Sequence, residues 1–219
     1  MNIAIIGYGK MGKAVETIAL ERGHTIGLKV INDRSEIDYS EIDVAIDFST
    51  PNSAPKLIKE SLENGVPTVS GTTGWLEKMS EIENVCLKNN TAFLYSSNFS
   101  VGMNLFFELN KQLNSLICNH KQYQASMTEI HHTHKLDAPS GTALSLKEDI
   151  ESNLEIESIR EGEIPGTHII NYNSNIDSIQ IKHEAHNRNG FAFGAVLAAE
   201  WITNKKGVFE MSDVLNLKK

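Results

Sequence analysis

A stretch of fifteen residues near the middle of the chain concentrates side chains that transfer protons and bind anions. Residues 129–143 read EIHHTHKLDAPSGTA and contain three histidines, one lysine and a Ser-Gly-Thr tripeptide. The charge of histidine changes near neutral pH, and Lys135, four positions after His131, adds a positive charge. His131 and Lys135 are therefore candidates for delivering a proton to a negatively charged substrate.

The same stretch contains the start of a predicted helix. Ser140 precedes an apolar run with helical spacing, so it is predicted to cap a helix over 141–153. The unpaired N–H groups of Gly141 and Thr142 would then face a carboxylate or phosphate, which the helix dipole favours. An ordinary polar loop before a capped helix is the alternative, but the density of reactive groups favours a site.

The N-terminus carries a glycine pattern typical of nucleotide-binding proteins. The apolar run 3–6 predicts a buried strand, and apolar residues at helical spacing over 14–20 predict a helix. Between them lies G-x-G-x-x-G, which in this context predicts dinucleotide binding. The expected contacts are Gly7, Tyr8, Gly9, Lys10, Met11 and Gly12.

The end of the next predicted strand bears on the choice of cofactor. Asp33 lies about twenty residues beyond Gly12, where an acid usually binds the ribose hydroxyls and favours NADH. Arg34 beside it could instead stack on the adenine or bind a 2′-phosphate. The choice between NADH and NADPH therefore stays open.

Strands and helices alternate through the first half of the chain and not through the second. The alternation predicts an α/β fold whose first domain is a doubly wound parallel sheet. Gly71, Thr72 and Thr73 follow a predicted strand at 68–70, where ligands collect in such sheets. Beyond about residue 121, grouped strands predict an α+β domain with a mixed sheet whose open face favours self-association.

Composition excludes several classes of function. The formal net charge is -8 without a strong basic run, which argues against nucleic-acid binding. No apolar run reaches membrane-spanning length, and the N-terminus does not resemble a signal peptide. Cys86 and Cys118 match no metal or redox spacing, so a cytoplasmic protein with reduced thiols is expected.

Several motifs together resemble one enzyme family. Residues 131–143 match H-H-x-x-K-x-D-A-P-S-G-T-A, 69–75 read VSGTTGW, 47–51 read DFSTP, 97–104 match S-N-F-S-x-G-x-N, and 207–215 match G-x-x-x-M-x-D-V-L. This combination resembles the 4-hydroxy-tetrahydrodipicolinate reductases, also called dihydrodipicolinate reductases. The resemblance covers nearly the whole chain, which is shorter than common family members.

The resemblance implies a reaction and assigns roles to residues. The expected activity is NADH- or NADPH-dependent reduction of a dicarboxylate, 4-hydroxy-tetrahydrodipicolinate, to tetrahydrodipicolinate in lysine biosynthesis. It implies His131 as proton donor or acceptor, Lys135 as second donor, and His132, Gly141 and Thr142 as substrate-binding residues. Ser96, Ser97, Asn98 and Phe99 are expected at the nicotinamide. His183 and Arg188, in a further family segment, are expected to be structural rather than substrate-binding.

The resemblance also implies a domain arrangement and an assembly. Residues 1–103 and 206–219 are expected to form the dinucleotide-binding domain, and 104–205 the substrate-binding and oligomerisation domain. A homotetramer is expected, although the shortened chain leaves a dimer open.

The sequence is also compatible with two other classes of function. Another NAD-dependent dehydrogenase of the same architecture would share the first half of the chain. An NAD-sensing protein without catalysis would keep the glycine motif but would have no need for His131 together with Lys135. Hydride transfer requires no metal, and the three clustered histidines lack a carboxylate or cysteine at zinc spacing, so no metal site is expected.

Overall fold

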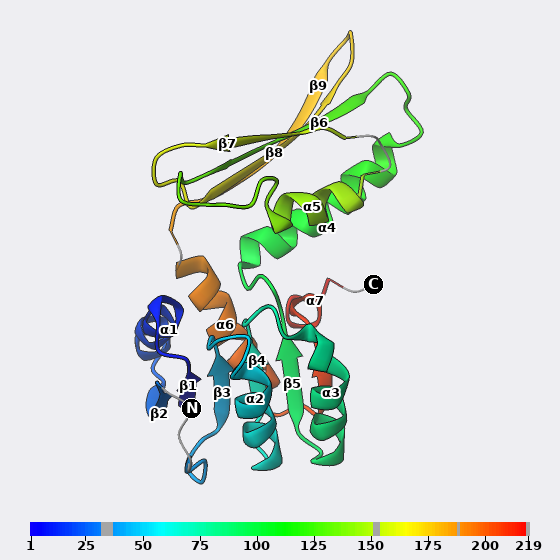
Figure 1. Cartoon of the computed structure of the whole chain (residues 1–219). Helices are drawn as coiled ribbons and strands as arrows, with labels where there is room; N and C mark the ends of the chain where they lie inside the picture. Colours follow the sequence, from blue (N-terminus) through cyan, green and yellow to red (C-terminus); the bar gives the residue numbers. More distant parts are fainter. Residues whose placement is uncertain (32–36, 151–153, 188, 218–219) are drawn as a thin grey trace. The chain divides into compact units, whose positions relative to one another are not determined.

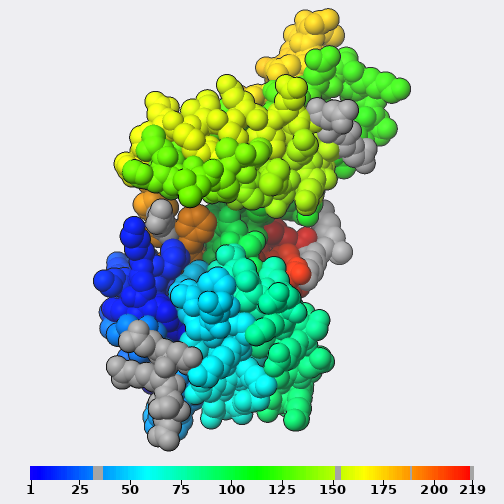
Figure 2. Space-filling model, in the orientation of Figure 1, coloured from blue at the N-terminus to red at the C-terminus, as the bar shows by residue number. Residues whose placement is uncertain are grey.

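The chain folds into two units, and the first is built from both ends of the sequence. The computed structural model describes residues 1–31, 37–150, 154–187 and 189–217. One unit comprises Met1–Val101 with Asn189–Lys219, and the other comprises Gly102–Arg188. In Figures 1 and 2 the C-terminal segment, coloured red, lies against the teal part of the N-terminal segment, so the first unit is discontinuous in sequence.

The first unit contains a parallel six-stranded sheet in which the strand order reverses at β1. The strands pair in the order β10-β5-β4-β3-β1-β2, and each neighbouring pair is parallel. Their bounds are β1 Asn2–Ile6, β2 Thr25–Val30, β3 Val44–Asp47, β4 Thr68–Ser70, β5 Ala92–Tyr95 and β10 Gly207–Phe209. Strand β2 lies on one side of β1, and β3 and the strands after it lie on the other side. Ligands bind in such sheets at this switch point.

Helices cover both faces of this sheet, as the apolar run of β1 predicts. Ile3 and Ile5 belong to a core shared with α1 (Lys10–Glu21) and α6 (Asn189–Ile202). Ala4 and Ile6 point to the opposite face, toward a core that includes Leu57 of α2 (Ala54–Glu63). Side chains alternate along a strand, so a strand buried on both faces has no polar positions. The doubly wound architecture is confirmed.

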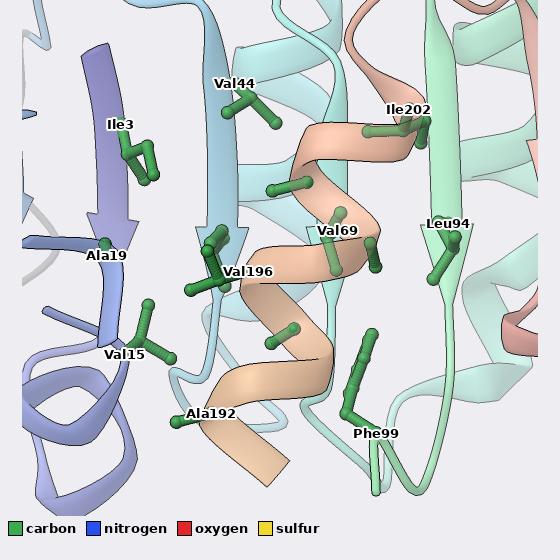
Figure 3. Packing of buried hydrophobic residues seen from close by; sticks show 14 of the residues in the cluster. Ile3, Val15, Ala19, Val44, Val69, Leu94, Phe99, Ala192, Val196 and Ile202 are labelled. Atoms are coloured by element: carbon green, nitrogen blue, oxygen red, sulfur yellow. The ribbon is translucent and has the colours of Figure 1, made fainter. Parts of the chain in front are cut away.

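Helix α6 belongs to the first unit, and the expected domain boundary at 205 is therefore wrong. Figure 3 shows Ala192, Val196 and Ile202 of α6 packed over the strands. Gly194 lies so close to the Phe99 carbonyl that an added Cβ would be 1.7 Å from its oxygen. An apolar helix of this kind covers the sheet face left open by α1, which explains why residues 189–205 pack here.

Shorter elements complete the first unit. The 3₁₀ turn Leu76–Lys78 leads into α3 (Met79–Lys88), and α7 (Met211–Val214) follows β10. Trp75 and Phe93 pack with Ile82 of α3, so α3 covers the same side as α2. None of the helices described in the structure is long and apolar enough to span a membrane.

The second unit is a mixed four-stranded sheet with two helices on one face. Its order is β7-β6-β8-β9, in which β6 pairs with β7 in parallel and the other two pairs are antiparallel. The strands are β6 Gln124–His131, β7 Ile156–Arg160, β8 Gly166–Asn173 and β9 Ser178–Ala185. Helices α4 (Val101–Ile117) and α5 (Gly141–Glu148) supply Phe106 and Leu146 to a core with Met127 (Figure 1). The predicted mixed sheet is confirmed, although β7 was not expected.

Leu105, Phe106, Leu109 and Leu113 lie at helical spacing and predict the packing face of α4, but this prediction is partly wrong. Leu105 and Leu109 are about half exposed, whereas Phe106 and Asn110 are buried. Asn110 donates a hydrogen bond to the Leu146 carbonyl oxygen of α5, which gives its buried NH2 group a partner. The helix is rotated so that this polar contact lies inside, which apolar spacing alone does not indicate.

Two glycines of α6 provide a test of its packing. We expect Gly194→Ala to lower the free energy of unfolding by roughly 1–3 kcal/mol, because the added methyl group collides with the backbone of residue 99. Gly190→Ala is the matched control, since its Cβ would meet nothing closer than the Ser100 Oγ at 4.0 Å. Urea unfolding of both variants measures the difference, and equal stability would contradict the proposed packing.

Candidate active site

The carboxyl ends of the parallel strands form a hollow in the first unit. Because the strands are parallel, Gly7 after β1, Phe48 and Ser49 after β3, and Ile31 after β2 all lie at one edge of the sheet. A hollow of about 290 Å³ opens there. Its lining comprises Gly7, Tyr8, Gly9, Val30, Ile31, Phe48, Ser49, Thr50, Ser53 and Leu57.

The three motif glycines occupy different environments. Gly7 has a φ of +88°, which side chains disfavour, and a Cβ there would be 2.3 Å from the Phe48 oxygen. A Cβ on Gly12 would be 2.2 Å from the Gly7 oxygen, so Gly12 permits close packing of α1. Gly9 is exposed and has open space around its Cβ position. The turn, the close packing and the open approach are the features that a bound pyrophosphate requires.

The N-terminus of α1 is available to an anion. Gly9 is its N-cap residue and supplies no side-chain cap, and Lys10 is exposed in the first turn. Two contacts fix the position of the Tyr8 side chain: its hydroxyl bonds to Glu16, and the Lys29 ammonium lies 4.7 Å from its ring centre. Met11 is half-buried against the core, which fits a packing role.

A buried aspartate joins the two loops that follow β3 and β4. Asp47 accepts hydrogen bonds from the Ser49 N–H at 3.1 Å and the Ser70 hydroxyl at 2.7 Å. The Thr72 hydroxyl accepts from the same Ser49 N–H at 2.9 Å. Burial raises the pKa of Asp47 above its ordinary value, against the opposing effect of these hydrogen bonds. The loop Gly71–Thr73 is thereby held beside the hollow, with Thr73 exposed.

The segment expected at the nicotinamide contains both core and surface residues. Ser97 is exposed, and Ser96 accepts a hydrogen bond from the Asn98 N–H at 3.2 Å. The Phe99 side chain is only 2% exposed and packs edge-on against Phe48, with ring centres 5.9 Å apart. Its ring is therefore part of the core, and only its backbone is left for a cofactor contact. Asp33, Arg34 and Arg188 lie outside the described residues.

In the second unit, one face of the sheet changes from apolar to polar along the strands. Strand register places Met127 beside Ile170 and Ile181, under the helices. Two residues further along β6, polar groups align across all four strands. This polar row consists of Ser158, Glu129, His168 and His183, from β7 to β9.

Glu129 connects the polar row to the loop that follows β6. Its carboxylate accepts hydrogen bonds from the Arg160 guanidinium at 2.9 Å and the Ser140 N–H at 3.0 Å. Burial alone would raise the pKa of Glu129, but hydrogen bonds from Ser140 and Arg160 outweigh it and lower the pKa to about 2. Arg160 also donates to the Asp137 carbonyl oxygen at 2.5 Å, so one ion pair holds both ends of the loop.

His131 lies at the end of β6 with its two ring nitrogens in different surroundings. Its Nδ1 is 3.3 Å from Glu129 Oε2, whereas a Cβ on Gly166 would be 3.1 Å from its Nε2. Glycine at 166 therefore leaves room beside Nε2. Burial lowers the pKa of His131; the charge of Glu129 opposes this effect and that of Lys135 adds to it. The ring is mainly uncharged near neutral pH.

Lys135 and the start of α5 meet at the Asp137 carboxylate. The Lys135 ammonium donates to both Asp137 oxygens, at 2.8 and 2.9 Å. This contact chiefly, and the Gly141 N–H to a smaller extent, lowers the pKa of Asp137. Gly141 is exposed with open space at its Cβ position. The Lys135 ammonium already binds one carboxylate beside the N-terminus of α5, so this arrangement can bind carboxylates.

The remaining predicted residues lie in the same segment. The Ser140 hydroxyl accepts from the Ala143 N–H at 3.1 Å, which confirms the predicted N-cap, although α5 ends at Glu148. Thr142 is half-buried in the first turn, and the His132 ring lies 6.2 Å from that of His134. Sequence reasoning did not select Glu129, Arg160 or His168, because their proximity depends on strand register.

Comparison with known proteins identifies the family. Residues 102–215 match the family model described as dihydrodipicolinate reductase, C-terminus, and residues 19–99 match the corresponding N-terminus model. The 4-hydroxy-tetrahydrodipicolinate reductase of Christiangramia forsetii is 44% identical over 99% of this chain and 98% of its own length. The chain belongs to the dihydrodipicolinate reductase family.

Other members of the dihydrodipicolinate reductase family support the same assignment. The enzyme of that name from Thermosipho africanus is 37% identical over 98% of both chains. Among solved structures, a dipicolinate-bound dihydrodipicolinate reductase from Paenisporosarcina sp. TG-14 has a TM-score of 0.79. It is 20% identical and covers 100% of this chain and 99% of its own, so it supports the fold.

Two motif glycines separate cofactor binding from folding. We expect Gly9→Ala to leave the melting temperature nearly unchanged but to weaken NADH binding, because its Cβ projects into open space. Gly12→Ala should instead lower the melting temperature, because its Cβ collides with Gly7. Fluorescence titration with NADH and thermal unfolding measure the two effects. Unchanged NADH binding in Gly9→Ala would exclude close approach of the cofactor at residue 9.

Asp47 predicts a dependence of stability on pH. Its pKa is higher in the folded than in the unfolded protein, so the folded state binds more protons, and stability falls as pH rises from about 4 through the folded pKa. The amide in Asp47→Asn does not titrate, so this dependence on pH is absent, while the side chain keeps its shape and one acceptor oxygen. The difference in free energy of unfolding, variant minus wild type, should be larger at pH 8 than at pH 4.5 in urea titrations. A difference that is constant with pH would contradict the burial effect.

Proposed function

We propose that this protein catalyses the NAD(P)H-dependent reduction of 4-hydroxy-tetrahydrodipicolinate to tetrahydrodipicolinate, in lysine and diaminopimelate biosynthesis. Relatives named for this activity are 44% and 37% identical over nearly the whole chain. The observation that supports it best is the second unit's short loop, which follows His131 and carries both Lys135 and the helix N-terminus at Gly141. Proton donors beside a carboxylate-binding helix end suit a dicarboxylate substrate.

The hollow in the first unit fits a dinucleotide. Gly7 and Gly12 shape the turn, and the open approach at Gly9 meets the uncapped N-terminus of α1. Gly71–Thr73 and Ser96–Asn98 would border the nicotinamide, which supplies the hydride when bound. The exposed Lys10 could bind phosphate, and the roles proposed for Asp33 and Arg34 leave both NADH and NADPH as candidates.

The residues of the second unit would bind the substrate and supply its proton. The N–H groups of Gly141 and Thr142 would take one carboxylate and His132 the other. The first carboxylate would compete with Asp137 for the same groups and would release Lys135 toward the substrate. The doubly negative substrate would raise the pKa of His131, so the ring would gain its proton as the substrate binds.

Reduction then requires a proton at the atom where electrons accumulate. His131 has space at Nε2, beside Gly166, through which its proton could be delivered. Lys135 is the second donor, and general acid catalysis of this kind contributes about a hundred- to ten-thousand-fold. Glu129 and Arg160 would act by holding the loop and would not contact the substrate.

Substitution of the two proposed donors tests the function. We expect His131→Ala and Lys135→Ala each to lower kcat by about a hundredfold or more, with NADH affinity retained. His134→Ala is the matched control, because this neighbouring histidine is 77% exposed and is not assigned to the reaction. The assay follows cofactor oxidation at 340 nm with substrate generated by the preceding synthase. Wild-type turnover in either donor variant would remove that residue's role.

We also propose a homotetramer that assembles through the second unit's sheet. Helices α4 and α5 cover one face, and within the described second unit no helix covers the other. Ile130, Ile159 and Ile169 are half-buried on that second face, where strand pairing places them together. A second copy would cover these side chains. Cys86 and Cys118 are both free, which supports a location in the cytoplasm.

The mass in solution tests the assembly. Light scattering should give four chains for the wild type and fewer for Ile169→Glu, because a charge would be buried at the contact. Ile176→Glu is the control, since Ile176 is 89% exposed in the β8–β9 turn. A monomeric wild type, or equal masses for both variants, would contradict the proposed contact.

A further inference from the structure

Three buried side chains of the second unit form an unexpected set of metal-ligand groups. Glu129 and His131 come from β6, and His168 lies directly opposite Glu129 on β8. One ligand atom from each lies within 4.8 Å of the other two. The exposed fractions of these residues are 0%, 7% and 4%. Two imidazoles and a carboxylate form a common ligand set for zinc.

The hydrogen bonds of these residues leave nitrogen atoms without partners. The Nδ1 of His131 is buried and accepts or donates no hydrogen bond, and the same holds for both ring nitrogens of His168. Buried polar atoms in folded proteins are nearly always bonded, so such a group calls for a ligand. The two rings lie edge to face with centres 5.2 Å apart, which prevents them from bonding to each other.

The surrounding charges define which ion the site could take. Arg160 donates to Oε1 of Glu129, while Oε2 lies 3.3 Å from His131 Nδ1. The guanidinium and the nearby Lys135 ammonium repel a cation, so a hard ion held only by charge is disfavoured. Zn²⁺ and similar ions form directional bonds to imidazole nitrogen and tolerate this repulsion better than Mg²⁺ or Ca²⁺.

We propose that Glu129, His131 and His168 form a binding site for Zn²⁺ or a similar transition-metal ion, whose occupation inhibits the enzyme. Tetrahedral bonds of about 2.0–2.2 Å place ligand atoms roughly 3.4 Å apart. Atoms as far apart as the 4.8 Å limit would therefore have to approach each other by about 1 Å or more when the ion binds. A metal on Nδ1 would occupy the imidazole ring of His131, which is the proposed proton donor. The inhibition rests on the proposed function, whereas the binding does not.

Calorimetry with Zn²⁺ on the untagged, chelator-treated protein tests the binding. We expect one ion per chain in the wild type, no comparable binding of Mg²⁺, and an affinity at least about tenfold weaker in His168→Phe, which keeps a ring but removes a ligand. His134→Gln is the control, because His134 and Glu163 form an exposed pair 3.6 Å apart that could hold zinc instead. Unchanged affinity in His168→Phe, or no Zn²⁺ binding by the wild type, would overturn the site.

Imidazole nitrogen NMR on the wild type provides a test that does not depend on folding of a variant. Zn²⁺ should shift the ring resonances of His131 and His168 and leave those of His134 in place; shifts confined to His134 would refute the assignment. In the 340 nm assay, Zn²⁺ should inhibit the wild type at the concentrations that saturate the site. Binding without inhibition of an active enzyme would refute only the inhibitory effect. An inactive wild type that still binds zinc would instead count against the proposed reaction.

Discussion

The second unit depends on the ion pair between the fully buried Glu129 and the partly buried Arg160. Together they reach the Ser140 N–H and the Asp137 carbonyl oxygen, and so connect two parallel strands, a loop and the start of α5. Removing one partner of such a pair typically costs about 3–5 kcal/mol, because the other charge is left buried. The loop that carries Lys135 therefore has a defined shape although most of its residues are exposed. Reactive groups on a short loop need such anchoring to act together.

One face of the second unit's sheet is apolar under the helices and becomes polar further along the same strands. On the face covered by helices, Met127 and Ile170 supply apolar packing, and two residues further along the same strands Glu129 and His168 form part of the polar row. The spacing of side chains along a strand makes this change abrupt. Hydrogen bonds from Arg160 and Ser140 offset the cost of burying this charge, which is why the pKa of Glu129 is low and not high.

Local signals in the sequence predicted much of the fold and part of the site. The glycine motif predicted the β1–α1 turn, because Gly7 adopts a positive φ and Gly12 packs closely against Gly7, as the structure confirms. Ser140 was correctly predicted as an N-cap because capping involves residues only three apart. Motifs also located the proposed proton donors. These features have in common that they depend on neighbours in sequence.

Features that depend on distant neighbours were missed or wrong. His168 lies 39 positions after Glu129 in sequence and meets it only through the register of β6 and β8, so it was not selected. Residues 189–205 were placed with the wrong unit, because an apolar helix does not indicate which sheet it covers. Leu105 and Leu109 are exposed because Asn110 occupies the inner face of α4, bonded to α5. Tertiary context overrode the local pattern in each case.

The discontinuous first unit has a consequence for how the chain is made. During synthesis, β1 to β5 emerge early, yet the face of their sheet that α6 covers stays bare until residues 189–202 leave the ribosome. The whole second unit must be translated in between. It can fold while tethered to an unfinished nucleotide-binding sheet, whose apolar surface would meanwhile be a natural target for chaperones. Closure of the polypeptide's first core is thus delayed to the last stage of translation.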